Sequence, residues 1–285
     1  MRPSGAAQVA GVAGWPISHS LSPRLMAAWI EAAGLDAIYA PFAIGPEGAE
    51  EAFKVLAKTG LTGLNITLPH KEIALKIADS SSDAAKAVGA ANLLTFKDGK
   101  SCADNTDVAG FLSSLEEGGA DPAYDPASGP ALVLGAGGAA RAIVYALKLA
   151  GCPEIILSNR TESRATALAE EMAINCSILP WDRRDEGLEQ ANLVINTTSL
   201  GLKGQNDLVM DWDQASQSCV VVDIVYTPLE TGFLKAAAGR GLKTIDGLGM
   251  LIGQARPSFE AFFGVPSDDQ LDVRALLETV LRHKS

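Results

Sequence analysis

The sequence predicts an α/β protein of two domains, the second of them built on a parallel sheet with helices on both faces. Three observations support this prediction. Short apolar segments of strand length alternate with segments of helical periodicity along the 285 residues. The glycine-rich stretch GAGGAAR at 135–141 directly follows one of these strands. The stretch GGADPAYDPASGP at 118–130 holds three prolines and three glycines, which makes it a candidate domain boundary.

The first half of the chain predicts short strands and helices in alternation. After a strand at 9–12, a helix is expected to begin with Ser22 as its N-cap and Pro23 in the first helical position, and to end at Gly34. Its apolar side chains share one face at helical spacing: Leu25, Met26, Trp29 and Ile30. The other elements expected here are helices at 46–58, from about 71 and from about 107, a strand at 61–68, and a hairpin of strands at 92–96 and 101–103.

The second half predicts a regular strand–helix rhythm. Strands are expected at 131–134, 154–158, 193–196 and 219–225, and helices at 138–150, 162–173, 247–263 and 270–282. Apolar strands that alternate with helices indicate a parallel sheet covered on both faces. The chain is therefore divided into a first domain at 1–107, a second at 108–245 and a C-terminal helical segment at 246–285.

Composition and charge exclude several classes of protein. The formal net charge of −11 argues against nucleic acid and anionic membranes as partners, and no apolar run approaches the ~18 residues of a membrane span. The first residues lack a secretory apolar segment. The scattered cysteines form no metal-binding pattern and are expected to be reduced, mostly buried thiols of a cytoplasmic protein: Cys102, Cys152, Cys176 and Cys219. A homodimer is compatible with this composition but is not indicated by it.

The stretch at 135–141 resembles the GxGxxG pattern of dinucleotide-binding turns, with alanine in the last place. The first glycine allows the tight turn, the second lets the backbone approach a pyrophosphate, and the small last residue lets helix and strand pack closely. The free N–H groups of the helix start would bind the phosphates. The candidate cofactor residues here are Gly135, Ala136, Gly137, Gly138 and Ala139. The alternative is an ordinary glycine-rich turn.

The end of the next strand distinguishes between the two nicotinamide cofactors. Enzymes that prefer NAD place a carboxylate there, whereas this chain has Asn159, Arg160 and Thr161, followed by Arg164. A guanidinium suits the 2′-phosphate of NADP, so NADP is the predicted cofactor. The alternative is a surface arginine beside a threonine N-cap. Polar residues that follow a further strand would also face the ligand crevice, or would form a plain polar loop: Asn196, Thr197 and Thr198.

The first domain carries polar clusters that point to a substrate site. Ser20 and Ser22 together form a hydroxyl pair at a helix start, which suits a carboxylate. Asn65 and Thr67 alternate with apolar residues, so both point to one face, where lining a cleft is favoured over burial in a core.

Acid–base candidates lie close by in the sequence. Lys71 opens a helix, and of the two carboxylates in DNTD at 104–107, one is expected to cap a helix and the other to pair with Lys71 for proton transfer. The alternative for Lys71 is an exposed surface lysine. His19 and His70 are expected to be packing residues.

These motifs, taken in order, resemble shikimate dehydrogenases along nearly the whole chain. Most are weak alone, but their common order makes a chance resemblance improbable. The matching stretches are GWPISHSLSP (14–23), NITLPHK (65–71), GAAN (89–92), DNTD (104–107), GAGGAAR (135–141), SNRT (158–161), NTTSLG (196–201), VVDIVYTP (221–228) and DGLGMLIGQA (246–255).

The resemblance implies a reaction and a role for each matching residue. NADPH would reduce 3-dehydroshikimate to shikimate, with Lys71 donating the proton and Asp107 orienting it, and no metal would be needed. Ser20 and Ser22 would bind the substrate carboxylate. The remaining implied contacts are Thr67, Asn92, Asp107 and Gln254 with ring hydroxyls, Asn65 and Tyr226 at the cleft, and Gly249 and Met250 near the nicotinamide.

The resemblance also implies that the helix at 247–263 returns to pack on the first domain, which would be the substrate domain beside a Rossmann-type cofactor domain. Two features depart from the family pattern. Ala103 stands where glycine is common, and Pro257 is expected to distort the helical turn that carries Gln254.

Three other functions remain open. A quinate or quinate/shikimate dehydrogenase would share the same lysine, aspartate and serines, although Arg160 favours an NADP-dependent biosynthetic enzyme. A methylene-tetrahydrofolate dehydrogenase of similar fold would leave the serine pair idle. A non-catalytic NADP-binding paralogue would not need Lys71 and Asp107 together.

Overall fold

The chain folds into two compact units. The structure, a computed structural model, describes residues 2–117 and 124–284. Unit 1 consists of Met1–Asp107 and Leu251–Thr279, and unit 2 of Val108–Met250 and Val280–Ser285. The units separate at 107/108 and 250/251, not within the proline-rich stretch 118–130, whose residues 118–123 lie outside the described part.

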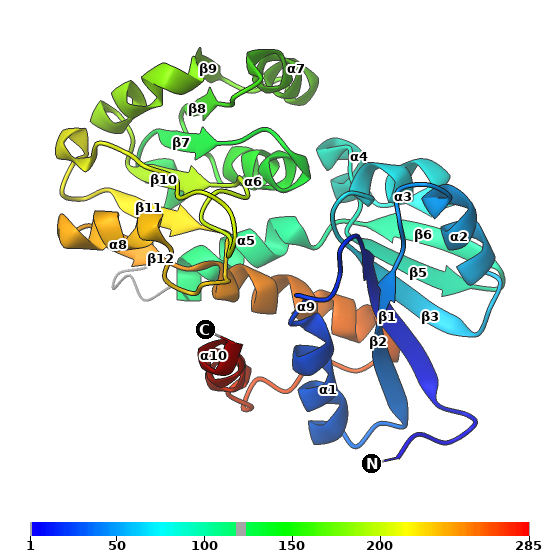
Figure 1. The fold of residues 1–285 in the computed structure, drawn as a ribbon. Helices are drawn as coiled ribbons and strands as arrows, with labels where there is room; N and C mark the ends of the chain where they lie inside the picture. Colours follow the sequence, from blue (N-terminus) through cyan, green and yellow to red (C-terminus); the bar gives the residue numbers. More distant parts are fainter. Residues whose placement is uncertain (1, 118–123, 285) are drawn as a thin grey trace. The chain divides into compact units, whose positions relative to one another are not determined.

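Unit 1 holds a six-stranded mixed sheet in the order β2-β1-β3-β5-β6-β4 (Figure 1). The strands are β1 (Gln8–Gly14), β2 (Ala37–Ala43), β3 (Leu61–Ile66), β4 (Ser80–Ser81), β5 (Leu93–Lys97) and β6 (Lys100–Asp104). β1 runs parallel to β2 and β3, and β5 is antiparallel to both β3 and β6. The β5–β6 hairpin is confirmed, because Asp98 (φ 53°) and Gly99 (φ 74°) have the two positive φ angles of a type I′ turn.

Helices cover both faces of this sheet. One face packs on α2 (Ala49–Leu56), α3 (Lys71–Ile77) and α4 (Asp83–Val88), around the buried ring of Phe53. The other face receives α1 (Ser22–Ala32) and the unit 1 part of α9 (Gly247–Phe263), whose Trp29 and Phe259 rings meet edge to face with centroids 5.6 Å apart. α10 (Val273–Lys284) ends the described chain.

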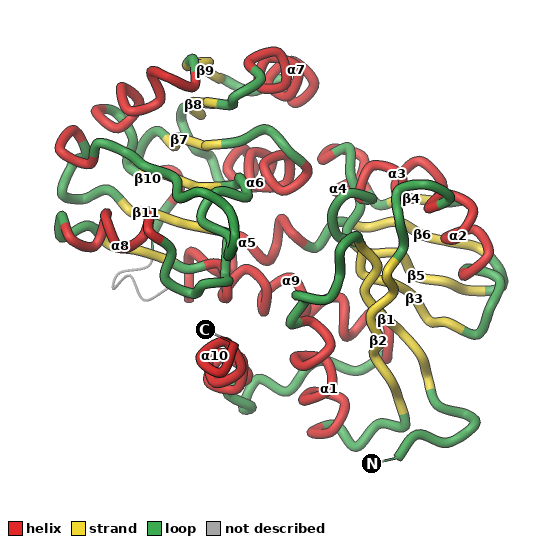
Figure 2. Tube along the Cα trace, viewed as in Figure 1, coloured by secondary structure: helices red, strands yellow, loops and turns green. Residues whose placement is uncertain are grey.

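Unit 2 is the parallel sheet that the sequence predicts. All of its strand pairs are parallel, in the order β12-β11-β10-β7-β8-β9, and Figure 2 shows them side by side in yellow. The strands are β7 (Ala131–Leu134), β8 (Ile155–Ser158), β9 (Cys176–Leu179), β10 (Leu193–Asn196), β11 (Val220–Asp223) and β12 (Lys243–Ile245). Every residue of β7, β8, β10 and β11 is buried, so both faces of the sheet are covered.

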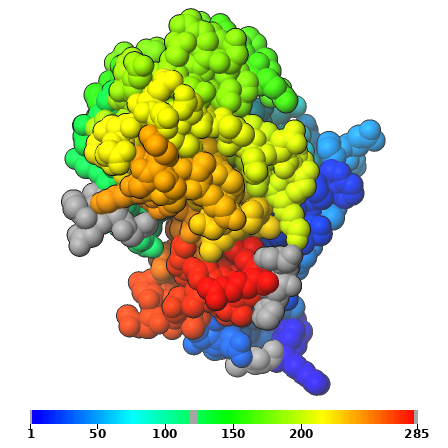
Figure 3. All heavy atoms as spheres, turned by 60° about the vertical axis from the view of Figure 1, so that its left-hand side comes forward, coloured from blue at the N-terminus to red at the C-terminus, as the bar shows by residue number. Residues whose placement is uncertain are grey.

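The helices of unit 2 connect these strands. They are α5 (Asp107–Glu117), α6 (Gly138–Leu149), α7 (Glu162–Met172) and α8 (Gly232–Gly239), with 3₁₀ turns η1 (Pro126–Ser128), η2 (Trp181–Glu189) and η3 (Trp212–Gln214). Leu132, Val194 and Val221 share a core with Phe233 of α8, and the tilted rings of Trp212 and Phe233 lie 5.1 Å apart. Figure 3 shows the chain around α8 (orange) on the surface of the molecule.

Several details of the sequence prediction are corrected. Ser22 is not an N-cap, because Leu21 holds that position and no side chain caps α1, while Ser22 itself is the first helical residue. α9 continues through Pro257 as one helix, and the expected distortion of the turn that carries Gln254 stays a prediction. Among the thiols expected to be mostly buried, only Cys219 is buried and Cys102 is exposed.

Several elements were not predicted from the sequence: β2, β4, β9, β12, α4 and α8. β2 contains Pro41, which argues against a central strand, and it lies at the edge of its sheet, where a missing N–H is tolerated. β4 and β12 have two and three residues, too few to show a period. No helix in the described ranges combines the length and apolar character of a membrane span.

Candidate functional site

Lys71 and Asp107 form a close ion pair in unit 1. Lys71 Nζ lies 2.5 Å from Asp107 Oδ2, and the side chains are 13% and 8% exposed. Each residue opens a helix, α3 and α5 respectively. The backbone fixes both ends of the pair, because the Lys71 carbonyl accepts from Ala91 N (2.9 Å) and Asp107 N donates to Asn105 Oδ1 (3.1 Å). A mostly buried pair with charge-assisted contact is held in one geometry.

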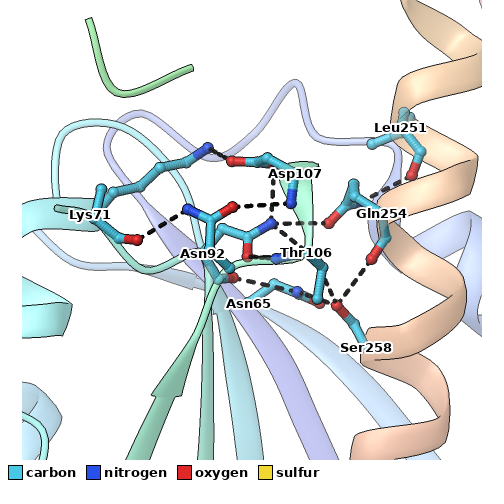
Figure 4. Close-up of polar contacts among 10 residues, drawn as sticks. Asn65, Lys71, Asn92, Thr106, Asp107, Leu251, Gln254 and Ser258 are labelled. Atoms are coloured by element: carbon cyan, nitrogen blue, oxygen red, sulfur yellow. Dashed lines mark hydrogen bonds and ion pairs between the residues drawn. The ribbon is translucent and has the colours of Figure 1, made fainter. Parts of the chain in front are cut away.

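Asn92 joins the aspartate to two other elements (Figure 4). Its Nδ2 donates to Asp107 Oδ1 (2.9 Å) and to Thr106 Oγ1 (2.9 Å), and lies 3.4 Å from Gln254 Oε1 of α9. Its Oδ1 accepts from Thr106 N at 2.7 Å. Since Asn92 is only 2% exposed, the amide is a fixed support for the carboxylate.

The α9 side of the cluster is polar, with Gln254 half-buried and Ser258 buried. Gln254 donates through Nε2 to Leu251 O (2.9 Å), and Ser258 Oγ donates to Gln254 O (3.0 Å). Asn65 Nδ2 donates to Ser258 Oγ (2.8 Å) and to Asn92 O (3.3 Å). The Asn65 side chain is 5% exposed and hydrogen-bonded within unit 1, and its place at a cleft stays a prediction.

Ser20 of the serine pair lines a cavity of unit 1. Ser22 N donates to Ser20 Oγ at 3.3 Å; Ser22 is buried and Ser20 half-buried. A cavity of about 460 Å³ opens beside Ser20 and is lined by Trp15, Pro16, Ile17, Ser18, Ser20, Pro23, Pro41 and Ala43. Trp15 N donates to Leu68 O (3.0 Å), which ties this loop to the segment after β3 that carries the half-buried Thr67.

The two histidines differ. His70 is fully buried, packs edge to face on Phe53 and places Nε2 2.7 Å from Ile44 O, so its expected packing role is confirmed. His19 is exposed, so the same expectation is wrong for it. In the described residues no group of histidine, cysteine, aspartate and glutamate side chains could hold a metal ion.

The glycine-rich turn of unit 2 has the geometry expected of a phosphate-binding turn. Gly135 has φ +115°, and a Cβ there would lie 2.4 Å from Thr197 Oγ1. Gly137 is the N-cap of α6, and a Cβ there would meet nothing within 4 Å. Ala140 is fully buried, as the close packing of helix and strand requires. β7 also lies where the strand order reverses, the usual ligand position in such sheets.

Arginines follow β8. Arg160 and Arg164 are both exposed, and their side chains make no hydrogen bond or ion pair with the residues that the structure describes. Asn159 Nδ2 donates to Thr161 O at 2.7 Å, which shapes the turn between them. Thr161 holds the N-cap position of α7 but makes no side-chain cap bond. Two guanidinium groups are therefore presented to solvent at the carboxyl end of the strand.

A buried carboxylate organises the loop after β10. Asp223 is fully buried and accepts from Asn196 Nδ2 (3.0 Å), Val225 N (3.0 Å) and Thr231 Oγ1 (2.7 Å). Asn196 Oδ1 accepts from Thr198 N (2.9 Å), and Thr197 Oγ1 donates to Leu134 O (2.8 Å). Burial raises the pKa of Asp223 to about 6 despite these bonds.

Comparisons with known proteins identify the family of the chain. Residues 12–94 match the shikimate dehydrogenase substrate binding domain, and residues 124–232 match the shikimate / quinate 5-dehydrogenase family. The chain is 50% identical to a shikimate dehydrogenase (NADP(+)) of Maricaulis maris over 97% of its own length and 98% of the relative's. The chain belongs to the shikimate dehydrogenase family.

Solved structures of this family share the fold. Shikimate 5-dehydrogenase of Thermus thermophilus, in complex with NADP(H) and shikimate, has a TM-score of 0.84 at 36% identity, covering 97% of this chain and 99% of that one. A quinate dehydrogenase of Corynebacterium glutamicum in complex with NAD reaches 0.85 at 29% identity, covering 97% and 99%. Fold similarity alone therefore does not separate shikimate from quinate dehydrogenases.

The structure brings together some of the site residues that the family resemblance implied. Lys71, Asn92, Asp107 and Gln254 form one hydrogen-bonded cluster in unit 1. Tyr226, Gly249 and Met250 belong to unit 2; Tyr226 is half-buried and Met250 is buried.

Three residues that bond to this cluster or to Asn65 were not predicted from the sequence: Thr106 bonds to Asn92, Ser258 to Gln254 and Tyr39 to Asn65. Ser258 lies one helical turn after Gln254 on the same face, a spacing that could have drawn attention to it.

The pKa of Asp223 leads to a stability prediction for Asp223→Asn. Between the ordinary pKa of an aspartate and about 6, the folded protein binds more protons than the unfolded one, so the free energy of unfolding falls as pH rises through this window. The free energy of unfolding falls by about 3 kcal/mol when the pKa of one group is raised by roughly two. The variant lacks this ionisation, so its free energy of unfolding should gain about 2–3 kcal/mol relative to wild type from about pH 4 to pH 7 in urea titrations. A difference independent of pH would contradict the assignment.

Proposed function

We propose that the chain catalyses the reversible NADPH-dependent reduction of 3-dehydroshikimate to shikimate. The observation that carries this proposal is the Lys71–Asp107 ion pair, mostly buried and joined to Asn92 and Gln254, in a chain of the shikimate dehydrogenase family. A ketone that accepts a hydride needs a proton at its oxygen, and the lysine ammonium is the positioned donor.

Lys71 and Asp107 have different roles in proton transfer. Lys71 Nζ gives its proton to the carbonyl oxygen of the ketone, and takes one back from the alcohol in the reverse direction. Asp107 holds the ammonium through Oδ2 and is itself held by Asn92 through Oδ1, so the donor keeps one orientation while its charge changes. NADPH, when bound, supplies the hydride.

The substrate is proposed to lie against unit 1. Ser20 and Ser22 would bind its carboxylate, and the cavity beside Ser20 supports this assignment. The ring hydroxyls would be bound by Thr67, Asn92, Asp107 and Gln254. Asn65, whose side chain is bonded inside unit 1, is proposed to lie at the cleft beside this group. Tyr226 of unit 2 is a proposed additional contact.

Unit 2 is proposed to be the cofactor domain. The backbone at 135–139 would bind the pyrophosphate, and the open space at Gly137 supports a close approach. Arg160 and Arg164, with Asn159 and Thr161, would bind the 2′-phosphate that distinguishes NADP from NAD. Thr197 and Thr198 would contact the cofactor from a loop that is held by hydrogen bonds between Thr198 and Asn196. Gly249 and Met250 would lie near the nicotinamide.

Two glycines of the turn give a matched pair of variants. Gly135→Ala combines a positive φ with a clash at Thr197 and should lower the free energy of unfolding by about 1–3 kcal/mol. Gly137→Ala has room for its methyl group, so it should fold normally but weaken NADP+ binding by filling the approach to the pyrophosphate. Thermal unfolding and NADP+ titration of both variants test this division. Unchanged NADP+ affinity in Gly137→Ala would show that the pyrophosphate lies elsewhere.

The first experiment measures reduction of NADP+ and NAD+ with shikimate and with quinate in parallel. Strong turnover of shikimate with NADP+ is the expected result. Turnover of quinate with NAD+, as the similarity to the Corynebacterium enzyme allows, would keep the site but change substrate and cofactor. NADP+ binding without any turnover would indicate a non-catalytic paralogue.

The cellular setting is a further part of the proposal. A cytoplasmic location is supported by the four cysteines, all of which are free. Assembly into a homodimer is a separate hypothesis, and sedimentation analysis of the purified protein would decide it.

A further inference from the structure

A directed chain of hydrogen bonds runs behind the candidate active site. The Tyr39 hydroxyl donates to Asn65 Oδ1 (2.7 Å), Asn65 Nδ2 donates to Ser258 Oγ (2.8 Å), and Ser258 Oγ donates to Gln254 O (3.0 Å). Tyr39, Asn65 and Ser258 are 7%, 5% and 0% exposed. Figure 4 shows Asn65, Ser258 and Gln254 meeting between the sheet and α9.

The Asn65 amide has only one orientation that satisfies its neighbours. Asn65 uses both amide protons, on Ser258 Oγ and on Asn92 O, and its oxygen accepts from Tyr39. Burial raises the pKa of Tyr39 well above its ordinary value, so its hydroxyl stays a donor. A flipped Asn65 amide would lose these bonds, so Asn65 keeps one orientation and Ser258 Oγ accepts from it. Ser258 Oγ lies 3.0 Å from Gln254 O and 3.4 Å from Thr106 Oγ1.

The chain ends at the turn of α9 that contains Pro257. Pro257 lies inside α9 and has no N–H, so the carbonyl four residues before it, that of Gly253, receives no helical bond from that position. The next residue is Ser258, whose hydroxyl bonds back to the carbonyl of Gln254. Asn65 of β3 therefore bonds to the α9 residue that directly follows Pro257.

We propose that Tyr39 and Ser258 are positioning residues, which together with Asn65 hold Gln254 and Asn92 in place for the substrate. This inference rests on the proposed function, because it assumes that Gln254 and Asn92 bind the ring hydroxyls. Neither Tyr39 nor Ser258 needs to touch the substrate. All members of the chain belong to unit 1, so NADP+ affinity should not depend on them.

The test uses two nearly isosteric variants, Tyr39→Phe and Ser258→Ala, and the double variant. Each single change should raise KM for shikimate by about fivefold, the equivalent of one buried hydrogen bond, with kcat changed less. The double variant should raise KM by less than the product of the single effects, because both changes release the same amide. The dissociation constant of NADP+, measured by direct titration, should stay at the wild-type value.

Ser101→Ala is the matched control for the loss of a buried hydroxyl. Ser101 is 4% exposed in unit 1 and bonds to Asp79 on the hairpin side of the sheet. Ser101→Ala should lower the melting temperature without a change in KM for shikimate.

Two results would overturn the positioning role. One is an unchanged KM for shikimate in both Tyr39→Phe and Ser258→Ala. The other is a KM that rises in Ser101→Ala by as much as it rises in these two variants. A wild-type enzyme inactive on shikimate would instead refute the proposed function, and the two failures are thereby distinguished.

Discussion

Lys71→Ala is expected to lower kcat for shikimate oxidation by about 10²–10⁴-fold, the usual contribution of a positioned acid or base. The hydroxyl proton of shikimate must leave as hydride departs, and Lys71 Nζ, held 2.5 Å from Asp107, is the acceptor that the cluster provides. NADP+ affinity should be unchanged, because Lys71 belongs to unit 1 and the candidate phosphate-binding turn to unit 2. Steady-state kinetics with a separate NADP+ titration measures both effects.

Lys76→Ala is the control for Lys71→Ala, since it removes a lysine from the same helix. The Lys76 side chain is 73% exposed and lies 3.2 Å from Glu50, away from Asp107. Its kcat should equal that of wild type. If Lys71→Ala kept kcat within about threefold of wild type, general acid–base catalysis by this lysine would be rejected.

Arg160→Ala is expected to raise KM for NADP+ by about 10–100-fold while KM for NAD+ changes little. A charge-assisted contact to a phosphate is stronger than a neutral hydrogen bond, and only NADP carries the 2′-phosphate. Removing Arg164 as well should abolish most of the preference for NADP+. Initial rates with each cofactor at saturating shikimate give the two constants.

The control for the cofactor variants is Arg183→Ala. Arg183 is an exposed arginine of unit 2 that pairs with Glu186 at 2.7 Å. Arg183→Ala should leave KM for NADP+ and KM for NAD+ unchanged. If Arg160→Ala raised KM for NADP+ and KM for NAD+ by the same factor, the arginine would support the fold of the turn. The 2′-phosphate would then have to be bound elsewhere.

The cofactor side was predictable from sequence because its elements are contiguous. Strand, glycine turn and helix follow one another within 131–149, so local rules recover the geometry of Gly135 and Ala140. The parallel sheet followed from the same rhythm. The choice between NADP and NAD also depends on neighbours along the chain, at 159–164.

The substrate side was predictable only in part, because it depends on long-range pairing. Lys71 and Asp107 could be proposed as partners, but the bond from Asn65 to Ser258 joins residues 193 positions apart, and no local period indicates it. Ser22 was wrongly expected to cap α1, because a serine before a proline has the same local signature whether it lies outside the helix or inside its first turn. Discrimination between shikimate and quinate remains a prediction, since it depends on the fit around one ring hydroxyl.

The discontinuity of unit 1 has a consequence for synthesis on the ribosome. Residues 1–107 emerge first. Two of their partners are made more than 140 residues later: the Phe259 ring, which packs on Trp29, and the Ser258 hydroxyl, which accepts a hydrogen bond from Asn65. Residues 108–250 of unit 2 emerge in between and contain a complete parallel sheet. Domains usually fold in the order in which they are translated. In this chain the segment translated first has to wait, with part of its core exposed to solvent and to chaperones, until α9 leaves the exit tunnel.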